Sequence, residues 1–161
     1  MAAKFSTGLR SKLLNGPGLI SALQGARLRV FCAASDPAHA DTTRVDVPAT
    51  ADAAEAGTLM LECTIGGDGV TGATFVDGGA GIAKLAAGQT LIAPAGLADG
   101  PIHYWRLVLD TDTHGESDTD VRVQGTVGLV TGEMLVTDVN IQAGAAWSLN
   151  HCSVEIPAEG A

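Results

Sequence analysis

Residues 102–128 decide the fold, and they read I-H-Y-W-R-L-V-L-D-T-D-T-H-G-E-S-D-T-D-V-R-V-Q-G-T-V-G. Two runs rich in β-branched and aromatic residues flank a short polar segment that contains a glycine, which is the pattern of a β-hairpin. Side chains alternate sides along a strand, so each run has two distinct faces. The apolar face holds His103, Trp105, Leu107, Leu109, Val121, Val123 and Val127, and the other face holds Tyr104, Arg106, Val108, Asp110, Arg122, Gln124 and Thr126. The stretch therefore predicts a half-buried antiparallel pair whose apolar face points into the core.

Shorter runs of the same kind fill the chain from residue 27 onward, and glycine-rich turns separate them. They cover residues 27–33, 59–65, 73–76, 82–85, 90–92, 133–137, 139–142 and 147–156. In the run 59–65, the inward side chains are expected to be Leu59, Leu61, Cys63 and Ile65. This spacing favours a mainly β fold, an antiparallel β-sandwich or jelly-roll-like domain over residues 27–161. Its core is expected to contain Trp105, Leu107, Leu109, Val121, Val123 and Trp147.

A short N-terminal helical arm, residues 1–26, is predicted ahead of this domain. Ser6 or Thr7 can cap its helix, and Asn15-Gly-Pro-Gly ends the helix before a second helical turn at residues 19–23. Because the helix has an apolar stripe to hide, we expect the arm to bind a neighbouring subunit, with packing on its own domain as the alternative. The expected partner-binding residues are Lys4, Phe5, Leu9, Arg10, Lys12, Leu13 and Leu14.

The segment 34–56 has two prolines, several acidic residues and little hydrophobic periodicity. Loops of this length inside a compact domain are uncommon and are often binding segments. We expect a long excursion on the surface. A helical turn at residues 49–56 is the alternative, since alanine-rich sequence favours a helix.

Charge is distributed unevenly along the chain. Residues 1–29 hold five basic residues and no acidic one, whereas the remainder holds four basic and 18 acidic residues, so that a net charge of +5 precedes one of −14. An acidic body repels phosphates, which argues against nucleic-acid binding. No apolar run approaches the roughly 20 residues of a membrane-spanning helix, and no signal sequence is apparent. We expect a protein that is cytosolic when made and has no membrane partner.

Candidate metal and thiol chemistry is sparse. Cys32, Cys63 and Cys152 lie far apart in apolar runs, so we expect buried free thiols, with a single Cys32–Cys152 bridge as the alternative. The four histidines, His39, His103, His114 and His151, have no zinc-binding spacing. No metal site is predicted from these residues.

The tip of the central hairpin, residues 110–118, partly matches the opening of a calcium-binding loop, in which oxygen ligands alternate before a glycine. The match fails at two positions, because His114 is a poor ligand for a hard cation and Val121 stands where a bidentate glutamate is required. Strands rather than helices flank the loop. A solvated hairpin tip is the favoured interpretation, and cation binding is the alternative.

The sequence contains no nucleophile-elbow Gly-x-Ser-x-Gly, and its glycine-rich turns lack the Lys-Ser/Thr of a phosphate-binding loop. We therefore expect no enzyme activity, no catalytic residues and no cofactor.

Several segments resemble a known family. These are F-S-T-G-L-R-S-K-L-L-N-G at residues 5–16, D-P-A-H-A-D at 36–41, A-G-T-L-M-L-E-C-T-I at 56–65, Y-W-R-L-V at 104–108 and V-R-V-Q-G-T-V-G at 121–128. Together with a later strand they are similar to a family of small structural proteins of tailed bacteriophages and prophages. The chain departs from the usual pattern by a longer acidic insert between residues 40 and 57.

The resemblance implies a virion structural protein without enzymatic activity. A minor capsid or head decoration protein bound to the major capsid protein is the first expectation, with the virion head as its location after a stage in the host cytoplasm. A tail- or fibre-associated virion protein is the alternative, and a small-ligand-binding β domain is the second alternative. The resemblance also implies a homo-oligomer, with a trimer favoured, whose copies meet through strand edges and the arm.

Overall fold

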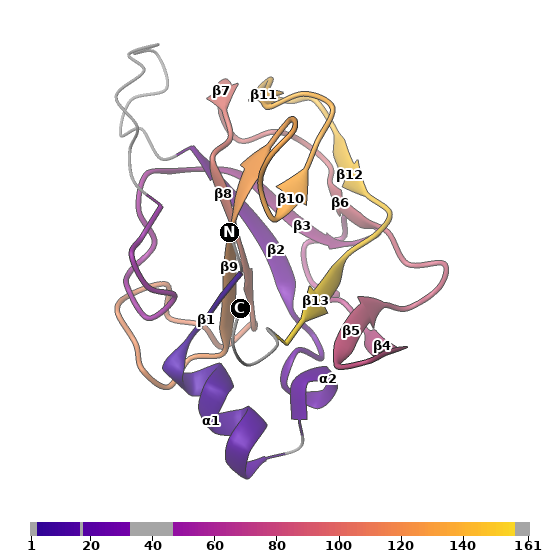
Figure 1. The fold of residues 1–161 in the computed structure, drawn as a ribbon. Helices are drawn as coiled ribbons and strands as arrows, with labels where there is room; N and C mark the ends of the chain where they lie inside the picture. Colours follow the sequence, from indigo (N-terminus) through magenta and orange to yellow (C-terminus); the bar gives the residue numbers. More distant parts are fainter. Residues whose placement is uncertain (1–2, 17, 33–46, 157–161) are drawn as a thin grey trace.

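A computed structural model describes residues 3–16, 18–32 and 47–156 of the 161-residue chain. The protein is mainly β, with antiparallel sheets and a short helical segment near the N-terminus, as the sequence predicted (Figure 1). Its helices are α1 Thr7–Asn15 and α2 Gly18–Ala22. Its strands are β1 Lys4–Phe5, β2 Arg27–Cys32, β3 Thr58–Ile65, β4 Phe75–Gly79, β5 Ile82–Leu85, β6 Leu91–Ala93, β7 Gly100–Pro101, β8 Tyr104–Val108, β9 Arg122–Gly128, β10 Met134–Leu135, β11 Asn140–Ile141, β12 Trp147–Leu149 and β13 Ser153–Glu155.

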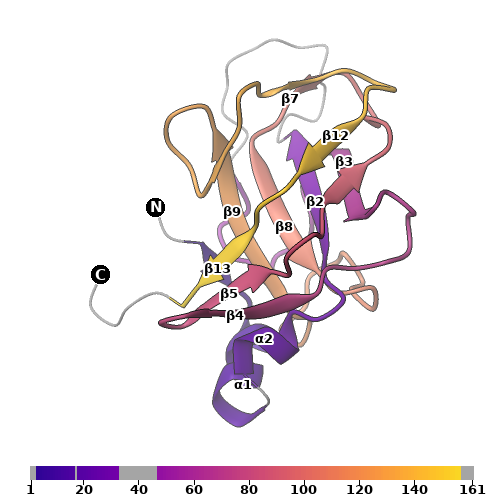
Figure 2. The same ribbon diagram turned by 90° about the vertical axis from the view of Figure 1, so that its right-hand side faces the viewer.

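One large sheet, called the main sheet below, organises the molecule. Its strand order is β1-β9-β8-β2-β3-β6-β12, and β10 joins β9 in parallel while the other pairs are antiparallel. A smaller antiparallel sheet, β13-β5-β4, lies across one face of the main sheet (Figure 2). The predicted hairpin is therefore real, and β8 and β9 are paired neighbours near one end of this sheet.

The hydrophobic core lies between these two layers. Phe75, Ala83 and Val154 of the small sheet belong to the same buried cluster as Val30 and Leu107 of the main sheet. Of the predicted core residues, Trp105, Leu107, Val121 and Val123 are buried, whereas Leu109 and Trp147 are only partly buried against the cluster. The alternation of residues 103–123 thus identified the face of the hairpin that is covered by the second layer.

The opposite face of the hairpin is also buried, which corrects the prediction of a half-buried pair. Its buried side chains are Tyr104, Arg106, Val108, Arg122 and Gln124. They are covered by residues 47–56, here called the strap, and by residues 109–121, here called the tip loop. Figure 1 shows the strap on the left of the main sheet, away from β13-β5-β4. The described part of the expected surface excursion is therefore a third layer, and it contains turns rather than a helix.

The N-terminal segment packs on the chain's own β domain. Strand β1 pairs with β9, with Lys4 opposite Gln124. Leu9, Leu19 and Leu23 join the core cluster, and Leu9 has no exposed surface. The expectation that Leu9 is buried against a neighbour is therefore corrected, because the sheet end beyond β9 supplies its packing partner.

Strand β3 departs from the predicted alternation. The pairing of β2 with β3 shifts between Val30 and Phe31, so that Val30 lies opposite Leu61 and Phe31 opposite Leu59. This irregularity skips Met60, which is fully buried in the main core. Leu59 instead packs on the other face, against Phe31 and Tyr104. A β-bulge of this kind moves the side chains on its N-terminal side in β3 to the opposite face of the sheet. Strict alternation along the sequence does not predict this change.

Cys32, Cys63 and Cys152 are free thiols, and Cys32 and Cys63 are buried as expected. Burial raises the pKa of the Cys63 and Cys152 thiols to about 12. In the described part of the chain, neither helix has the length and apolar composition needed to cross a membrane.

Candidate functional site

A row of polar side chains crosses the strap side of the main sheet in a single register. Going from β3 to β1, its directly opposed members are Glu62, Arg29, Arg106, Gln124 and Lys4. Two arginines are thus adjacent on a buried face, where a charge costs free energy unless it is paired or hydrogen-bonded. The contacts that satisfy this row define the most polar site of the interior.

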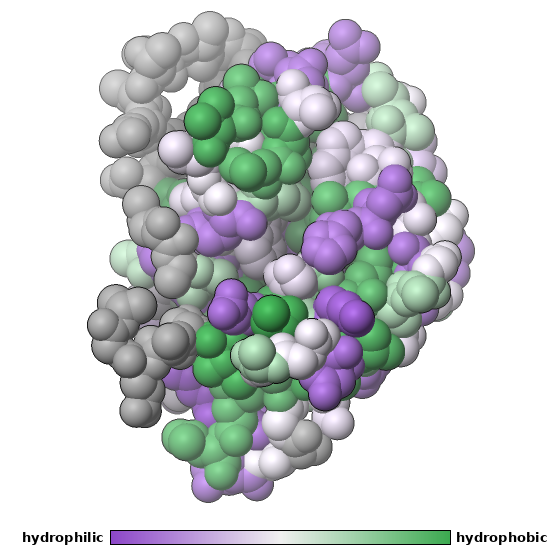
Figure 3. All heavy atoms as spheres, turned by 45° about the vertical axis from the view of Figure 1, so that its right-hand side comes forward, coloured by the Kyte–Doolittle hydropathy of each residue, from purple (hydrophilic) through white to green (hydrophobic). Residues whose placement is uncertain are grey.

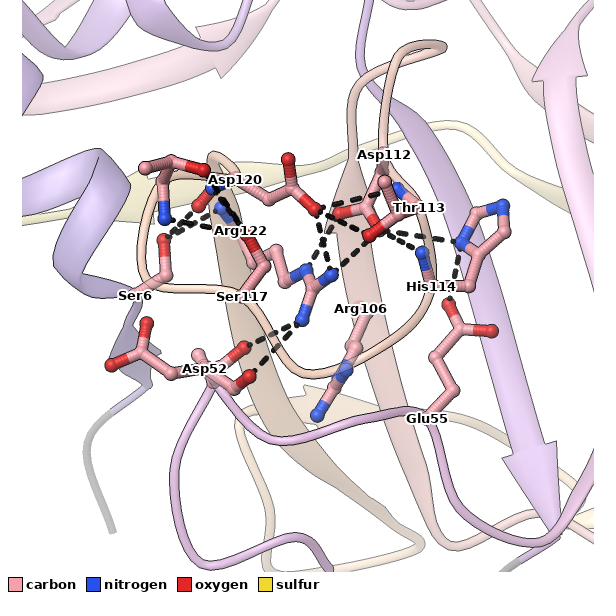
Figure 4. Close-up of polar contacts among 12 residues, drawn as sticks. Ser6, Asp52, Glu55, Arg106, Asp112, Thr113, His114, Ser117, Asp120 and Arg122 are labelled. Atoms are coloured by element: carbon pink, nitrogen blue, oxygen red, sulfur yellow. Dashed lines mark hydrogen bonds and ion pairs between the residues drawn. The ribbon is translucent and has the colours of Figure 1, made fainter.

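Arg122 lies at the centre of the site and has no exposed surface. Its guanidinium makes a bidentate contact with Asp112, with Nε donating to Oδ2 at 2.6 Å and Nη2 to Oδ1 at 2.8 Å, and Nη2 also donates to Asp120 at 2.9 Å (Figure 4). Burial lowers the pKa of Arg122, but the hydrogen bonds and charges of the two carboxylates outweigh burial and raise it above its ordinary value. The guanidinium is a permanent cation that fixes the tip loop on the sheet.

The strap is held by side chains that bind its backbone carbonyl groups. Arg106 Nη1 donates to the Ala53 carbonyl at 2.9 Å, and Gln124 Nε2 donates to that of Pro48 at 2.7 Å. Arg122 Nη1 lies 3.2–3.4 Å from the carbonyl oxygens of residues 51–53. These side chains supply the hydrogen-bond donors that the backbone of a neighbouring strand would otherwise supply. The strap therefore needs no regular secondary structure to satisfy its backbone.

The C-terminal end of the strap is fixed by Tyr104 and Glu55. The Tyr104 hydroxyl accepts a bond from the Ala56 amide at 2.9 Å and donates to the Ala56 carbonyl at 2.5 Å, while its ring stacks on Phe31 with centroids 4.7 Å apart. Burial raises the pKa of Tyr104, so the hydroxyl keeps the proton that it donates. Glu55 accepts from Arg29 at 2.9 Å.

The strap and the tip loop also meet the start of α1. Asp52 accepts bonds from the amide and hydroxyl of Thr7, both at 2.7 Å, so its carboxylate stabilises the N-terminus of the helix. Ser6 Oγ accepts from the Leu9 and Arg122 amides and donates to the Asp120 carbonyl (Figure 4). Ser6 is thus the helix cap that the sequence predicted and a connection between the helix, β9 and the tip loop.

The tip loop is largely exposed, as the predicted solvated hairpin tip would be, except where it contacts the sheet and the strap. Asp112 is buried by its contact with Arg122, and His114 adopts a left-handed backbone with φ 61°. His114 Nδ1 lies 3.2 Å from Glu55 Oε1, which brings the loop against the strap. Within residues 3–16, 18–32 and 47–156 no three His, Cys, Asp or Glu side chains form a group that could hold a metal ion.

The polar site is built for holding segments together. Its charged groups contact one another or backbone carbonyls, and Arg106, whose pKa is lowered by burial, donates to Gln124 Oε1 at 2.7 Å. Sequence reasoning missed this site because it assigned Arg106, Arg122 and Gln124 to an open face. The sequence did contain one indication of a covered face. Two arginines and a glutamine lie on one face of adjacent strands, and the chain has an acid-rich segment that could cover them.

The predicted partner-binding residues of the arm divide into two groups. Leu9 is buried, Phe5 and Leu13 are partly buried on the core, and Lys4 donates to the Pro48 carbonyl at 3.4 Å. Arg10, Lys12 and Leu14 are exposed, and Leu14 has 83% of its surface accessible. These last three residues, called the α1 face below, are the part of the arm that remains available to a partner.

A second exposed apolar group was not predicted from the sequence. It lies on the connection between β9 and β10 and is called the hairpin knob below; its members are Leu129, Val130 and Leu135, which are 55%, 84% and 59% exposed. Figure 3 shows hydrophobic surface at the upper end of the molecule, over this connection.

The hairpin knob is held in a defined shape. Glu133 accepts bonds from the amide and hydroxyl of Thr126 at 2.7 and 2.5 Å. Gly128 passes so close to the Thr131 carbonyl that a Cβ would lie 1.8 Å from its oxygen. The exposed side chains therefore stand on an ordered loop, which lowers the entropy lost when a partner binds.

A pocket of about 290 Å³ adjoins the hairpin knob. Its lining includes Leu28, Trp105, Met134, Leu135, Leu149 and Cys152. The Trp105 indole packs on β9 over Gly125, and its buried Nε1 has no hydrogen-bond partner. The lining also includes the polar side chains of Glu133, His151 and Ser153.

Comparison with known proteins gives no matching family model, no matching curated protein and no matching solved structure.

Proposed function

We propose that the chain is a structural subunit of a bacteriophage virion, a minor capsid or head decoration protein that binds the major capsid protein. The observation that carries this proposal is the hairpin knob, in which three large hydrophobic side chains are exposed on an ordered loop. Such groups on an otherwise polar surface mark sites of protein–protein contact. The sequence resemblance gives the class of assembly in which that contact is made.

The buried polar site supports the same proposal. Its arginines and carboxylates are engaged in fixing the strap, the tip loop and α1 on the sheet. A subunit of a particle needs surfaces of fixed shape more than reactive groups. The acidic net charge of −9 is also consistent with a partner that is protein rather than nucleic acid.

The proposal is tested on purified particles of a phage or induced prophage that encodes this chain. Heads and tails are separated, and each fraction is analysed for the chain by mass spectrometry. Recovery with tail-free heads in a fixed ratio to the major capsid protein is expected. Recovery with tails alone favours the tail- or fibre-associated alternative, and absence from both fractions overturns a virion role.

A second candidate function, binding of a small ligand, rests on the pocket beside Trp105. An apolar compound with a polar group matches a lining that combines apolar side chains with Glu133, His151 and Ser153. Trp105 fluorescence titrated with small aromatic ketones tests this candidate in a Trp147→Phe background. A saturable change that is lost in Leu149→Phe, which narrows the pocket without adding a tryptophan, supports it, and no change at millimolar ligand eliminates it.

A further inference from the structure

The two ends of the molecule carry exposed hydrophobic side chains beside charges of opposite sign. Figures 1 and 2 place α1 at the lower end of the molecule and β7 at the upper end, and Figure 1 places β10 and β11 near β7. Hydrophobic surface is visible at both ends in Figure 3. An end-to-end contact is therefore possible for two copies of the same chain.

The α1 face at the lower end is apolar and basic, whereas the tip loop packed on the start of α1 exposes Glu116 and Asp118. Leu14, 83% exposed, follows Arg10 by four residues on α1, so the two side chains share one side of the helix, and Lys12 is exposed as well. Residues 1–29 contain no acidic residue. The two other basic side chains nearby, Arg27 and Arg29, are engaged by carboxylates of the chain itself. The positive charge that remains exposed at this end is therefore on the α1 face.

The upper end is apolar and acidic. The hairpin knob presents Leu129, Val130 and Leu135 to solvent. Asp99 and Asp138 are exposed beside β7 and β11, whose pairing joins Pro101 to Asn140. Residues 94–103 and 127–149, which include this end, contain no lysine or arginine. An apolar and basic surface complements it in both respects.

We propose that a second copy of this chain places its α1 face on the hairpin knob of the first. Leu14 then meets the knob side chains, and Arg10, on the same side of α1, faces the acidic residues around them, while Lys12 on the other side of the helix adds positive charge without contact. This inference rests on the proposed function, because it names the neighbouring subunit that the exposed part of the arm binds. The surface charges contribute orientation and rate of encounter, and the apolar contact contributes most of the affinity.

The proposed contact is heterologous, since it joins two different surfaces. A heterologous pair leaves one α1 face and one hairpin knob unused, so it does not close as a dimer, and the smallest closed assembly is a ring of three copies. A two-fold symmetric dimer could form both contacts at once only if the two surfaces lay on one side of the molecule, whereas they lie at its opposite ends.

The first test is the mass of the isolated protein at low salt, measured by analytical ultracentrifugation up to about 1 mM, a concentration that detects weak association. Assemblies of three or more copies that dissociate as salt is added are expected. A monomer at every concentration, or a dimer as the final species, overturns the inference. Val130→Asp and Leu14→Glu should each weaken association at least about tenfold. Val70→Asp is the matched control, because Val70 is 72% exposed but lies at neither end.

The second test mixes the two variants. A Leu14→Glu copy keeps an intact knob, and a Val130→Asp copy keeps an intact α1 face, so the mixture can form one good contact and no more. A heterodimer from two monomeric variants is expected. Two variants that remain monomeric when mixed, while the wild type assembles, overturn the head-to-tail arrangement.

Failure of this inference differs from failure of the proposed function. If knob and helix variants keep the wild-type mass but no longer bind heads, the surfaces contact the major capsid protein and the inference is overturned while the virion role stands. If the chain assembles as proposed but is absent from particles, the contact between copies stands and the virion role is overturned.

Discussion

Arg106 on β8 stands directly opposite Arg29 on β2, on the face of the main sheet that the strap covers. Like charges in this position destabilise a sheet unless other groups compensate them. Arg29 meets Glu55 and Glu62 at 2.9 and 3.0 Å, whereas Arg106 donates to Gln124 Oε1 and the Ala53 carbonyl. The two arginines therefore share one environment but have different partners, carboxylates for Arg29 and neutral acceptors for Arg106.

Arg122→Met is expected to lower the free energy of unfolding by about 3–5 kcal/mol, because it leaves the buried Asp112 carboxylate without its bidentate partner. Arg122→Met combined with Asp112→Leu should cost less than the sum of the two single substitutions. Urea unfolding at pH 7 measures all three variants. Additive losses would show that the two side chains do not interact.

Arg106→Met is expected to cost less, about 1–2 kcal/mol, although Arg106 is as deeply buried as Arg122. The substitution deprives Gln124 Oε1 of a hydrogen-bond donor, but the Ala53 carbonyl still accepts a bond from Arg122 at 3.2 Å. No described carboxylate loses an ion pair within 4.0 Å. Urea unfolding compares it with Arg122→Met. An equal or larger loss for Arg106→Met would contradict this account of the polar site.

Gly8→Ala is expected to lower the free energy of unfolding by about 1–3 kcal/mol, even though alanine is the better helix former. A Cβ at residue 8 would lie 2.2 Å from the Thr119 carbonyl oxygen and 2.5 Å from that of Asp120, so α1 or the tip loop must shift. Ser11→Ala, at an exposed position of the same helix, is the control and should be neutral or slightly stabilising. Thermal melts of both variants decide the matter, since equal behaviour would mean that α1 is not seated on the tip loop.

Stability should fall in acid. Burial raises the pKa of Asp120, but hydrogen bonds from Thr113 and the charge of Arg122 outweigh burial and hold that pKa below its ordinary value. Burial also raises the pKa of Glu133, but hydrogen bonds from Thr126 outweigh it, so this pKa is lowered as well. A carboxyl with a lowered folded-state pKa adds stability that is complete above its unfolded-state pKa and is lost as the pH falls through its folded-state value. The melting temperature should therefore drop steeply below about pH 4.

Glu133→Gln should flatten this acid dependence, whereas Glu116→Gln at an exposed site should leave it unchanged. Melting curves between pH 7 and pH 2.5 provide the measurement. A wild-type curve with no fall below pH 4 would show that these carboxyls are not stabilised by folding.

The thiols should resist alkylation in the native protein. With pKa values raised to about 12 by burial, Cys63 and Cys152 are thiolates in only about one molecule in ten thousand at pH 8, and the thiolate is the reactive form. Iodoacetamide followed by mass spectrometry should find no adduct at either residue in native protein and full modification in urea. Rapid labelling of Cys152 in native protein would mean that the pocket beside β13 opens.

The sequence was sufficient for the class of fold and for one face of the central hairpin. Trp105, Leu107 and Val123 lie in the core because strict alternation places all three on the apolar face of the hairpin. The other face was misassigned because polar residues usually face water, and alternation cannot show that a distant segment covers them. The strap covers Arg106 and Arg122 with its backbone carbonyl groups. Because every residue has such a group, the order of side chains in the sequence does not show which segment will cover the arginines.

The arm and the hairpin knob illustrate the same limit. Local chemistry predicted Ser6 or Thr7 as the helix cap, and the structure shows Ser6 in that position. Whether Leu9 packs on its own sheet or on a partner depends on where β9 lies, which residues 1–26 do not encode. The knob escaped notice because exposed Leu129 and Val130 continue a β-like run, and only the bend at Gly128 turns them outward.

The joining of β1 to β9 also bears on how the molecule folds. Ser6 and Arg122, which are hydrogen-bonded through the serine hydroxyl, are 116 residues apart in sequence. Strand β1 therefore cannot pair until β9 has been synthesised, and contacts of this separation form slowly because a long loop must close. If this pairing is the last step, Phe5→Ala should speed unfolding and leave the refolding rate unchanged in stopped-flow experiments, and slowed refolding would place it earlier. Until that step, the outer edge of β9 has open backbone groups, and the nascent chain is exposed to strand exchange with its neighbours.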